Sequence, residues 1–288
     1  MKKLNKITVI GVGLIGGSFA KGLKEANLVE QIVGYGKTES TLKQAVELGV
    51  VDSYSTDLAE AVANSDLVFI ATPLGAMGQV MMDMQPHINE NTVITDGGSA
   101  KSEVIALAEQ AFGRLPDNFV PGHPIAGKEK SGVTAADGKL YINHRVILTP
   151  LATTNQAAIA LVTELWQALG ANVETMTAQQ HDEIFAATSH LPHLLAFALV
   201  DMLNEHPELG DVFKYTAGGF RDFTRIASSD ATMWRDISTQ NSIAIVKWLQ
   251  AYQDELSNII KLVENKDGDA LFDIFTSAKN ARDTHIVK

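Results

Sequence analysis

The segment ITVIGVGLIGGSFAKGL, residues 7–23, decides the fold of the first half of the chain. It places Gly11, Gly13 and Gly16 in a G-x-G-x-x-G pattern between an apolar, strand-like run and a helix-compatible run. The first glycine allows a tight turn, the second lets the backbone approach a pyrophosphate, and the third lets helix and strand pack closely. The helix N-terminus then offers free N–H groups to the phosphates. The segment therefore predicts dinucleotide binding; the alternative is a glycine-rich packing turn.

The second strand of such a unit usually ends in an acidic residue, about 20 residues beyond the fingerprint, that holds the ribose 2′-hydroxyl. In QIVGYGKTES, residues 31–40, Gly36 stands there, followed by a lysine and hydroxyl side chains. Without a carboxylate to repel a 2′-phosphate, NADP is the expected cofactor; if Lys37 is merely solvated, NAD also binds. Thr72 and Pro73 are expected to wall the cofactor, or simply to end a strand. The expected cofactor-binding residues are Gly11, Gly13, Leu14, Ile15, Gly16, Gly36, Lys37, Thr38, Ser40, Thr72 and Pro73.

The bulk composition excludes several classes of protein. The chain has 288 residues, 45% of them hydrophobic, which at about 150 residues per domain predicts two domains. It has no cysteine, so disulfides, thiolate metal sites and cysteine nucleophiles are excluded. With 23 Lys and Arg against 34 Asp and Glu, we expect no nucleic-acid partner. No apolar run reaches about 18 residues and no cleavable leader is visible, so we expect a cytoplasmic protein outside the membrane.

Short apolar runs alternate with helix-compatible segments through the first half of the sequence. The runs end in Gly or Pro and are KITVIGVG, EQIVGYG, DLVFIATP, NTVITDGG, NFVPGHP and HRVILTP. The alternation predicts an α/β fold over residues 1–174, a Rossmann-type, mostly parallel sheet with helices on both faces. From 175 to 288 nearly every segment is helix-compatible, so we expect an all-helical second domain. Its long helices carry apolar residues on more than one face, which predicts a homodimer formed through this domain.

Five segments, in this order and at these spacings, resemble the prephenate and arogenate dehydrogenase family of tyrosine biosynthesis. They are GVGLIGGSFAKGL, TDGGSAKSEV, GHPIAGKEKSG, SHLPHLLAFAL and GGFRDFTRIASSDATMWRDI. The last three are much more specific than the glycine fingerprint. The resemblance implies a small-molecule substrate, prephenate or arogenate, that passes a hydride from its ring carbinol carbon to NAD(P)+ and loses carbon dioxide, so that the ring becomes aromatic.

The resemblance also implies roles for a histidine and a serine. His123 corresponds to the family's catalytic histidine, which draws off the proton of the ring hydroxyl, and an imidazole with a pKa near 6.5 suits that task. The alternative is a histidine that only holds its loop by hydrogen bonds. Ser99 corresponds to a catalytic-site serine between nicotinamide and substrate; instead or in addition, it caps the helix that begins near Lys101.

His190, His193 and Arg225 are the expected substrate-binding residues. The two histidines would share a face of a continuous helix, although Pro192 either kinks that helix or starts a new one. A metal site is one alternative for the two histidines, but it lacks a suitable third ligand, so we expect no metal. The other alternative is a pair of hydrogen-bonded histidines at a helix junction. Arg225 corresponds to the family's carboxylate-binding arginine, whose fork geometry fits a carboxylate; the alternative is an ion pair with Asp222 at helical spacing.

Two other functions are open at this level. A 3-hydroxyacid dehydrogenase shares the layout, but it would need a catalytic lysine early in the second domain, and the sequence has none between 175 and 213. The other is a nucleotide-sensing regulator without catalysis, which the histidine and serine together disfavour. The sequence leaves open prephenate against arogenate, the strictness of NADP over NAD, and inhibition by tyrosine.

Overall fold

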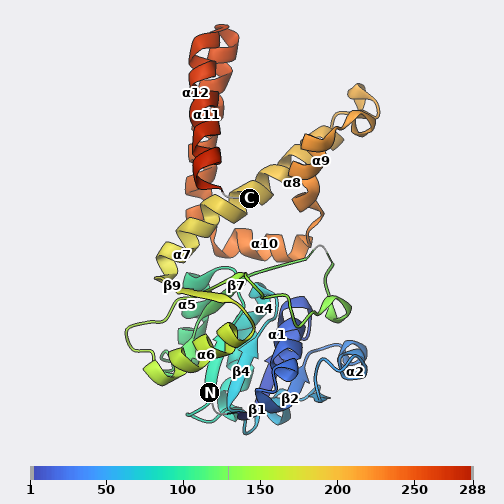
Figure 1. Cartoon of the computed structure of the whole chain (residues 1–288), viewed down its shortest axis with the longest axis vertical. Coiled ribbons are helices and arrows are strands. Elements are labelled where there is room, and N and C mark those ends of the chain that lie inside the picture. The colour runs from blue at the N-terminus through green and yellow to red at the C-terminus, as the bar shows by residue number, and fades with distance from the viewer. Residues whose placement is uncertain (1–2, 129, 287–288) are drawn as a thin grey trace. The chain divides into compact units, whose positions relative to one another are not determined.

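The structure is a computed structural model that describes residues 3–128 and 130–286. The chain divides into two compact units, Met1–Ser242 and Ile243–Lys288. In the first unit a sheet flanked by helices is followed by a helical segment, and the second unit consists of helices alone among its described residues (Figure 1). The α/β prediction for the first half and the helical prediction beyond it are both confirmed.

The main sheet has six strands in the order β3-β2-β1-β4-β5-β6, and every pairing in it is parallel. This is the strand order of dinucleotide-binding folds, whose ligand lies in the crevice where the order reverses, beside β1 and β4. The strands are β1 (Leu4–Ile10), β2 (Val29–Tyr35), β3 (Ser53–Ser55), β4 (Leu67–Ile70), β5 (Val93–Asp96) and β6 (Phe119–Val120).

Helices cover both faces of this sheet, because side chains of successive strand residues point to opposite faces. In β4, Phe69 joins the core under α1, α2 and α6, whereas Val68 and Ile70 join the core under α3, α4 and α5. The helices are α1 (Leu14–Glu25), α2 (Glu39–Glu47), α3 (Leu58–Val62), α4 (Leu74–Met84), α5 (Lys101–Phe112) and α6 (Gln156–Ala168). Both faces are thus buried, as a parallel sheet requires.

The last three strands form a second, smaller sheet, which the sequence did not predict. In it β7 (Gly122–Ile125) pairs antiparallel with β8 (Arg145–Leu148), and β8 pairs parallel with β9 (Asn172–Thr175). The run NFVPGHP, expected as one strand, divides at Pro121 into β6 and β7. Proline has no N–H to donate to a ladder, so a change of sheet at this residue is favourable.

A continuous helical stretch of 27 residues, Ala178–Asn204, leads into the helical segment. It consists of α7 (Ala178–Phe185), a π-helical turn (Ala186–His190) and α8 (Leu191–Asn204), with Pro192 in the first turn of α8. By length and composition alone this stretch could cross a membrane, but α7 packs against α5 and carries buried polar side chains. We therefore interpret it as part of the site described below.

The helix-compatible sequence beyond residue 230 is divided between separate helices. After α9 (Gly218–Thr224), two helices follow in close succession, α10 (Ala231–Gln240) and α11 (Ser242–Glu264). The break falls at Asn241, whose side chain is buried and binds the neighbouring α7 region. A tertiary hydrogen bond thus accompanies the interruption of the helical pattern.

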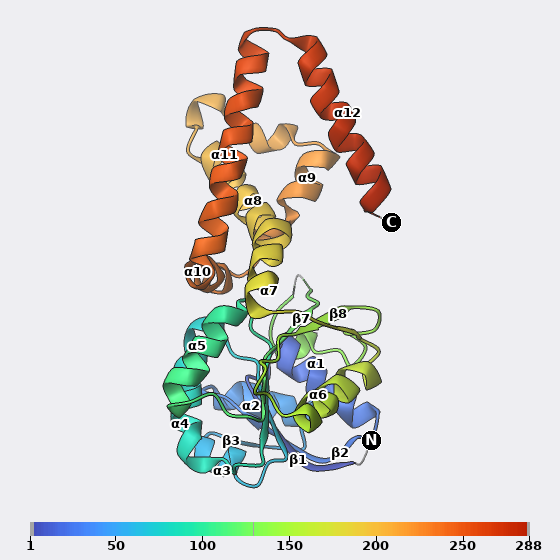
Figure 2. The same ribbon diagram turned by 90° about the vertical axis from the view of Figure 1, so that its left-hand side faces the viewer.

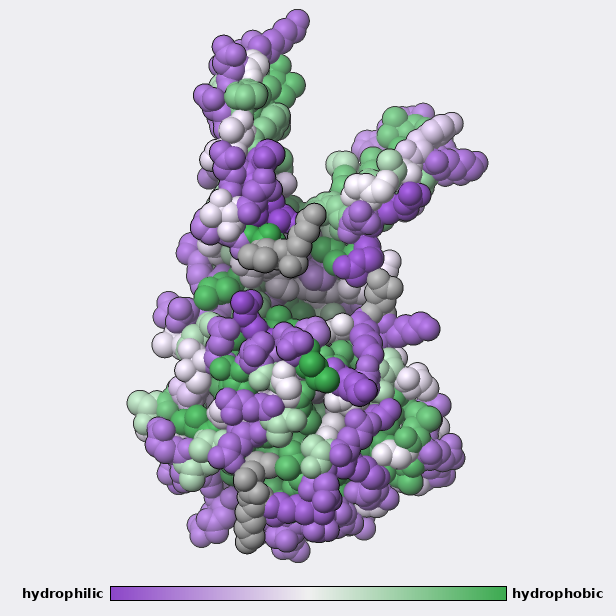
Figure 3. All heavy atoms as spheres, in the orientation of Figure 1, coloured by the Kyte–Doolittle hydropathy of each residue, from purple (hydrophilic) through white to green (hydrophobic). Residues whose placement is uncertain are grey.

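The second unit exposes many apolar side chains. Its helices α11 and α12 (Gly268–His285) diverge from the turn that joins them (Figure 2). Figure 3 shows hydrophobic residues at the surface of these helices. The large exposed apolar residues include Ile243, Tyr252, Leu256, Ile260, Val263, Phe272 and Phe275. Contiguous exposed apolar surface on a protein usually marks an interaction site.

Candidate active site

The expected cofactor residues follow the carboxyl ends of three adjacent strands. Ile10 at the end of β1 is in register with Tyr35 of β2 and with Ile70 of β4. Gly11 and Gly36 directly follow Ile10 and Tyr35, and Thr72 lies two residues after Ile70. The structure therefore brings the three groups of cofactor residues to one edge of the sheet, at the crevice where dinucleotides bind in this fold.

Two of the fingerprint glycines are required by close packing, and the third faces open space. Gly11 has φ +92°, and a Cβ there would lie 2.6 Å from the carbonyl oxygen of Ala71. A Cβ at Gly16 would collide with the carbonyl oxygen of Gly11, whereas a Cβ at Gly13 would meet nothing within 4 Å. Gly13 is also the N-cap of α1 and brings no capping side chain. The first turn of α1, with Leu14 and Ile15, can thus offer its N–H groups to phosphate oxygens.

The ribose end of the site lacks a carboxylate at the expected position. A Cβ at Gly36 would lie 3.5 Å from Leu42, an ordinary contact, so the glycine is not required by crowding. The nearby acidic residue, Glu39, is occupied by Lys43 and by the Tyr54 hydroxyl, at 3.2 and 3.1 Å. The side chains that carry the ammonium and hydroxyl groups are exposed: Lys37, Thr38 and Ser40.

The Thr72 hydroxyl at the end of β4 is buried and meets no hydrogen-bond partner among the described residues. A buried hydroxyl without a partner is costly, so a ligand atom that bonds it would be favoured here. Pro73, which is exposed, is the N-cap of α4. Both residues fit the predicted wall of a cofactor site, and Pro73 also fits the alternative of a strand end.

A buried ion pair connects β5, α5 and the start of β7 next to His123. Asp96 ends β5, Lys101 begins α5, and neither side chain is exposed to solvent. The Lys101 ammonium bonds the Asp96 carboxylate and donates to the carbonyl of Gly122 at 2.7 Å, while the Gly122 amide donates to Asp96 at 3.1 Å. Burial lowers the pKa of Lys101, and the Asp96 charge opposes that shift. The pair therefore fixes the start of β7, where His123 lies.

Ser99 lies half-buried in the turn between β5 and α5. The helix-capping alternative for Ser99 is wrong, because the N-cap of α5 is Ala100 and makes no side-chain cap. The first amides of α5 are capped from another element: Lys101 N and Ser102 N donate to the two carboxylate oxygens of Asp182, at 2.7 and 2.8 Å. The Ser99 side chain is thus not needed to cap the helix.

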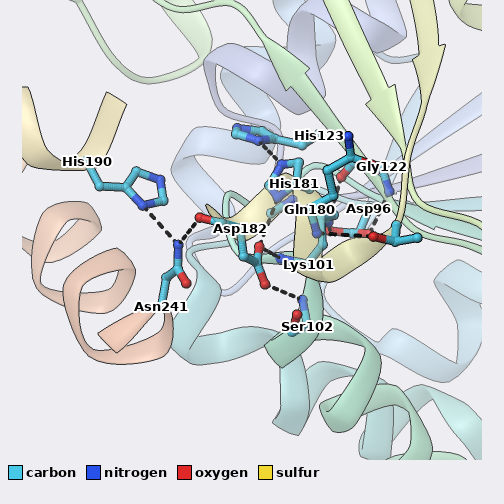
Figure 4. Close-up of polar contacts among 12 residues, drawn as sticks. Asp96, Lys101, Ser102, Gly122, His123, Gln180, His181, Asp182, His190 and Asn241 are labelled. Atoms are coloured by element: carbon cyan, nitrogen blue, oxygen red, sulfur yellow. Dashed lines mark hydrogen bonds and ion pairs between the residues drawn. The ribbon is translucent and has the colours of Figure 1, made fainter. Parts of the chain in front are cut away.

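His123 is half-buried on β7, where it contacts α7. Its Nδ1 lies 2.8 Å from Nε2 of His181 (Figure 4), and its ring packs edge-on against Phe185. Burial lowers the pKa of His123 well below its ordinary value, and the nearby His181 and Lys101 lower it further. The ring is therefore a neutral imidazole at neutral pH, with Nε2 left for a substrate or for Ser99.

The second expected histidine is almost completely buried. His190, 1% exposed, ends the π-helical turn and accepts a hydrogen bond at Nδ1 from the Asn241 amide, at 3.2 Å. The same amide donates to the backbone carbonyl of Asp182 at 2.9 Å. Burial and the nearby His181 lower the pKa of His190 to about 4. This arrangement matches the hydrogen-bonded junction alternative, without excluding contact with a ligand through Nε2.

His193 of α8 contacts Trp234 of α10. Their rings stack with centroids 3.9 Å apart, and Nδ1 of His193 donates to the Ser189 carbonyl at 2.8 Å. The Trp234 ring also meets His190 edge-on at 6.0 Å, so the two histidines share one aromatic neighbour as their helical spacing predicted. The indole N–H of Trp234 is buried and meets no acceptor among the residues described.

Arg225 is exposed and lines a cavity of about 680 Å³. The cavity also contacts Gly127 and Lys128, in the loop that follows His123, so it joins two motifs that are distant in sequence. Its basic lining comprises Lys21, Lys128, Lys130 and Arg225, with Asp137 as its acidic member. The Arg225 charge contributes to the lowered pKa of His193, after the larger effect of burial. An excess of positive charge suits a substrate with two carboxylates.

Several residues of the site were not predicted from the sequence. They are Asp96, Lys101, His181, Asp182, Trp234 and Asn241. Asp96, Lys101 and Trp234 lie inside the motifs quoted above, so their place in those motifs was a usable signal. His181 and Asp182 lie outside the motifs, and only the docking of α7 onto α5 brings them to the site.

Comparisons with known proteins agree with this geometry. Residues 19–175 match the model of the prephenate dehydrogenase nucleotide-binding domain, and residues 177–277 match that of the prephenate dehydrogenase dimerization domain. The cyclohexadienyl dehydrogenase of Zymomonas mobilis is 35% identical over 98% of this chain and 96% of its own length. The prephenate dehydrogenase of Bacillus subtilis is 37% identical over 96% of this chain and 75% of its own length.

Solved structures give the same result. The crystal structure of Aquifex aeolicus prephenate dehydrogenase, in complex with hydroxyphenyl propionate and NAD+, superposes with a TM-score of 0.91 at 36% identity, covering 97% of this chain and 98% of that one. Synechocystis arogenate dehydrogenase superposes with a TM-score of 0.80 at 28% identity, covering 98% and 100%. The fold, the nicotinamide-cofactor domain and the matches along nearly the whole chain lead to one conclusion: the chain belongs to the prephenate dehydrogenase family.

Proposed function

We propose that the protein oxidatively decarboxylates prephenate, or arogenate, to 4-hydroxyphenylpyruvate, or tyrosine. The observation that carries the proposal is the position of His123, which is bonded to His181 and precedes the loop whose Gly127 and Lys128 line the basic cavity together with Arg225. A base, a hydride acceptor and a carboxylate anchor are the groups this reaction needs. The Aquifex aeolicus relative binds hydroxyphenyl propionate and NAD+, which supports the same ligand classes here.

The residues of the site account for the proton and charge changes. When bound, the nicotinamide cofactor accepts the hydride from the ring carbinol carbon. Nε2 of His123 takes the hydroxyl proton, and the electron pair of that O–H bond forms a carbonyl. The bond to the ring carboxylate then breaks, its electrons enter the ring, and carbon dioxide leaves. His123 can return its proton to the oxygen, which gives the phenol with no net proton change.

The other expected site residues are proposed to bind and orient the substrate during this step. Ser99 can hydrogen-bond the reacting hydroxyl or Nε2 of His123, because Nδ1 is already bonded to His181. Arg225 is proposed to hold a substrate carboxylate, with bidentate geometry that lysine cannot supply. His190 and His193, which share Trp234, are proposed to line the ring side of the substrate.

We further propose NADP as the preferred cofactor, with NAD as an alternative. The proposal is supported by Gly36 in place of a ribose-binding carboxylate and by the exposed Lys37, Thr38 and Ser40 beside it. The proposed residues of the crevice are those of the fingerprint, this turn, and Thr72 and Pro73.

The proposed assembly is a homodimer formed through the helical domain. It is supported by the match of residues 177–277 to a dimerization domain and by the exposed apolar side chains of α11 and α12. The matched ranges also support a domain boundary near 175, between a cofactor domain of residues 1–174 and a helical domain of residues 175–288. We propose a cytoplasmic enzyme with no nucleic-acid or membrane partner.

The decisive experiment follows reduced-nicotinamide absorbance with prephenate or arogenate, each with NADP+ and NAD+. Turnover with one of these pairs is expected, and failure of all four would overturn the proposal. In the same assay, His123→Asn should lower kcat by about 10²- to 10⁴-fold, as expected for loss of a general base. Cofactor affinity, measured by fluorescence titration, should remain within about twofold, since His123 is not expected to contact the phosphates or ribose.

A further inference from the structure

A chain of three side chains connects His123 to the start of helix α5. Nδ1 of His123 lies 2.8 Å from Nε2 of His181, and Nδ1 of His181 lies 2.8 Å from Oδ1 of Asp182 (Figure 4). The Asp182 carboxylate in turn accepts from the amides of Lys101 and Ser102. His181 is not exposed to solvent, and Asp182 is 6% exposed. The chain therefore runs through the interior, from the reacting side chain to the backbone.

The hydrogen-bond donors in this chain can be assigned from its far end. Burial alone would raise the pKa of Asp182, but hydrogen bonds from His181, from Ser102 and from the Lys101 amide outweigh it, and the pKa is lowered. Asp182 is therefore ionised and can only accept, so Nδ1 of His181 carries a proton. Burial lowers the pKa of His181 despite the Asp182 charge, so that ring is neutral. Its Nε2 then has a lone pair and no proton.

We propose that His181 is a positioning residue that, anchored by Asp182, holds His123 in the tautomer with its proton on Nδ1. Because Nε2 of His181 can only accept, Nδ1 of His123 must donate to it. Nε2 of His123, on the opposite side of the ring, is then the free base. This inference rests on the proposed role of His123 as the base and adds what fixes its protonation pattern and orientation.

The anchor of this chain is stiff. Asp182 is the cap of α5 and lies at the positive end of that helix, which favours its negative charge. The backbone amide of Lys101 donates to Asp182, and the Lys101 side chain forms the buried ion pair with Asp96. A base whose tautomer is fixed loses no population to the unreactive form, and a wrong tautomer at such a position can cost about 10⁴-fold in rate.

The first test reads the tautomer directly. Proton–nitrogen correlation spectra of the histidine rings, in protein labelled with nitrogen-15 at a pH where His123 is neutral, distinguish a protonated Nδ1 from a protonated Nε2. The signals of His123 are identified as those missing in His123→Asn. We expect Nδ1 to be protonated in the unmodified enzyme; a proton on Nε2 would overturn the proposal, whatever any variant does.

The second test removes the acceptor. His181→Leu should move the His123 proton to Nε2 in part or whole and lower kcat by about 10²- to 10⁴-fold, with the KM for cofactor within about twofold. His181→Gln, whose amide oxygen can still accept, should keep the Nδ1–H tautomer and recover most of the lost kcat. The proposal would be overturned if His123 in His181→Leu kept the tautomer of the unmodified enzyme and kcat stayed within twofold of the unmodified value.

A matched control separates this effect from general loss of structure. Thr8, also fully buried, loses two hydrogen bonds in Thr8→Val, those to the Ala61 carbonyl and to the Ser65 hydroxyl at 2.6 and 2.7 Å. This variant should keep the tautomer and kcat of the unmodified enzyme. If His123→Asn itself retains full turnover, the proposed function of His123 fails; if it is inactive while His181→Leu is normal, only the positioning role fails.

Discussion

The carboxylate of Asp236 accepts a hydrogen bond from the amide of Gly75 at 3.0 Å, across 161 residues of sequence. Asp236 lies on α10, is 5% exposed, and is also bonded by Arg235 at 2.6 Å. Gly75 is in the first turn of α4. Asp182 of α7 caps α5 in the same way, so two acidic residues attach the helical segment to the N-termini of helices that flank the main sheet. Both contacts place a negative charge where the helix dipole favours it.

Substitutions of Asp236 and Gly75 should have strongly coupled effects on the free energy of unfolding. Asp236→Ala leaves a helix amide without its acceptor and should lower the free energy of unfolding by about 1–3 kcal/mol. Gly75→Ala should have a similar cost, because its Cβ would lie 2.8 Å from the Asp236 carboxylate. The double variant should cost less than the sum by about 1 kcal/mol or more, measured by urea denaturation.

Gly218→Ala is the control for that cycle. It also lies in the first turn of a helix, but a Cβ there meets nothing within 4 Å, so its effect should be within about 0.5 kcal/mol. Strict additivity of the Asp236 and Gly75 variants would contradict the direct contact.

His190 should make stability depend on pH below neutrality. Its folded-state pKa of about 4 lies below the ordinary value near 6.5, so the unfolded chain binds a proton first as the pH falls. The neutral ring contributes its full stabilisation above pH 6.5, and this contribution is lost as the pH falls toward 4. Between pH 7 and 5 this one group should cost on the order of 2 kcal/mol.

The His190 prediction is measured by urea denaturation at both pH values and at one fixed protein concentration. His190→Gln should lose less stability over this interval than the unmodified protein, because the other buried histidines titrate in both. An identical pH dependence in the two proteins would show that His190 is not buried as a neutral ring.

The cofactor preference should change when a carboxylate is introduced after β2. Gly36→Asp places a negative charge where a 2′-phosphate would lie, and the space beside Leu42 accepts a side chain. The ratio of kcat/KM for NADP+ over that for NAD+ should fall about tenfold or more, which corresponds to roughly 1.4 kcal/mol. Gly36→Asn has the same size without the charge and should shift the ratio much less. Equal shifts for both would point to size as the cause.

Arg225 should affect the substrate and not the cofactor. Loss of a charge-assisted hydrogen bond of about 1.5–3 kcal/mol in Arg225→Gln should raise the substrate KM by about 10- to 100-fold. Arg225→Lys keeps the charge without the fork geometry and should be intermediate. Steady-state kinetics with each substrate varied would check this, and an unchanged substrate KM with a raised cofactor KM would assign Arg225 to the other ligand.

The exposed apolar faces of α11 and α12 should hold the dimer together. Ile260→Lys combined with Phe272→Lys, at residues 55% and 68% exposed, should shift the mass measured by light scattering toward that of one chain. Leu48→Lys changes an apolar residue of similar exposure, 49%, in the first unit and should leave the mass unchanged. A mass unaffected by the double change would move the interface elsewhere.

Much of the first half of the molecule could be predicted because its signals are local. The glycines at 11, 13 and 16, the apolar runs and the punctuation by Gly and Pro depend on backbone sterics and on neighbouring residues, so they are legible in one sequence. Ser99, His123 and Arg225 were found because the short segments that contain them resemble those of a known family. Each of these signals extends over a few residues.

The sequence by itself thus determined the alternation of strands and helices in the first half, the nucleotide-binding turn and the motif that carries the proposed base. Only the tertiary structure decided how that base is held. The pairing of His123 with His181, the capping of α5 by Asp182, and the break at Asn241 join residues more than 50 positions apart. Such contacts leave no periodic trace in the sequence, since they arise when buried polar groups must find partners as separate elements pack together.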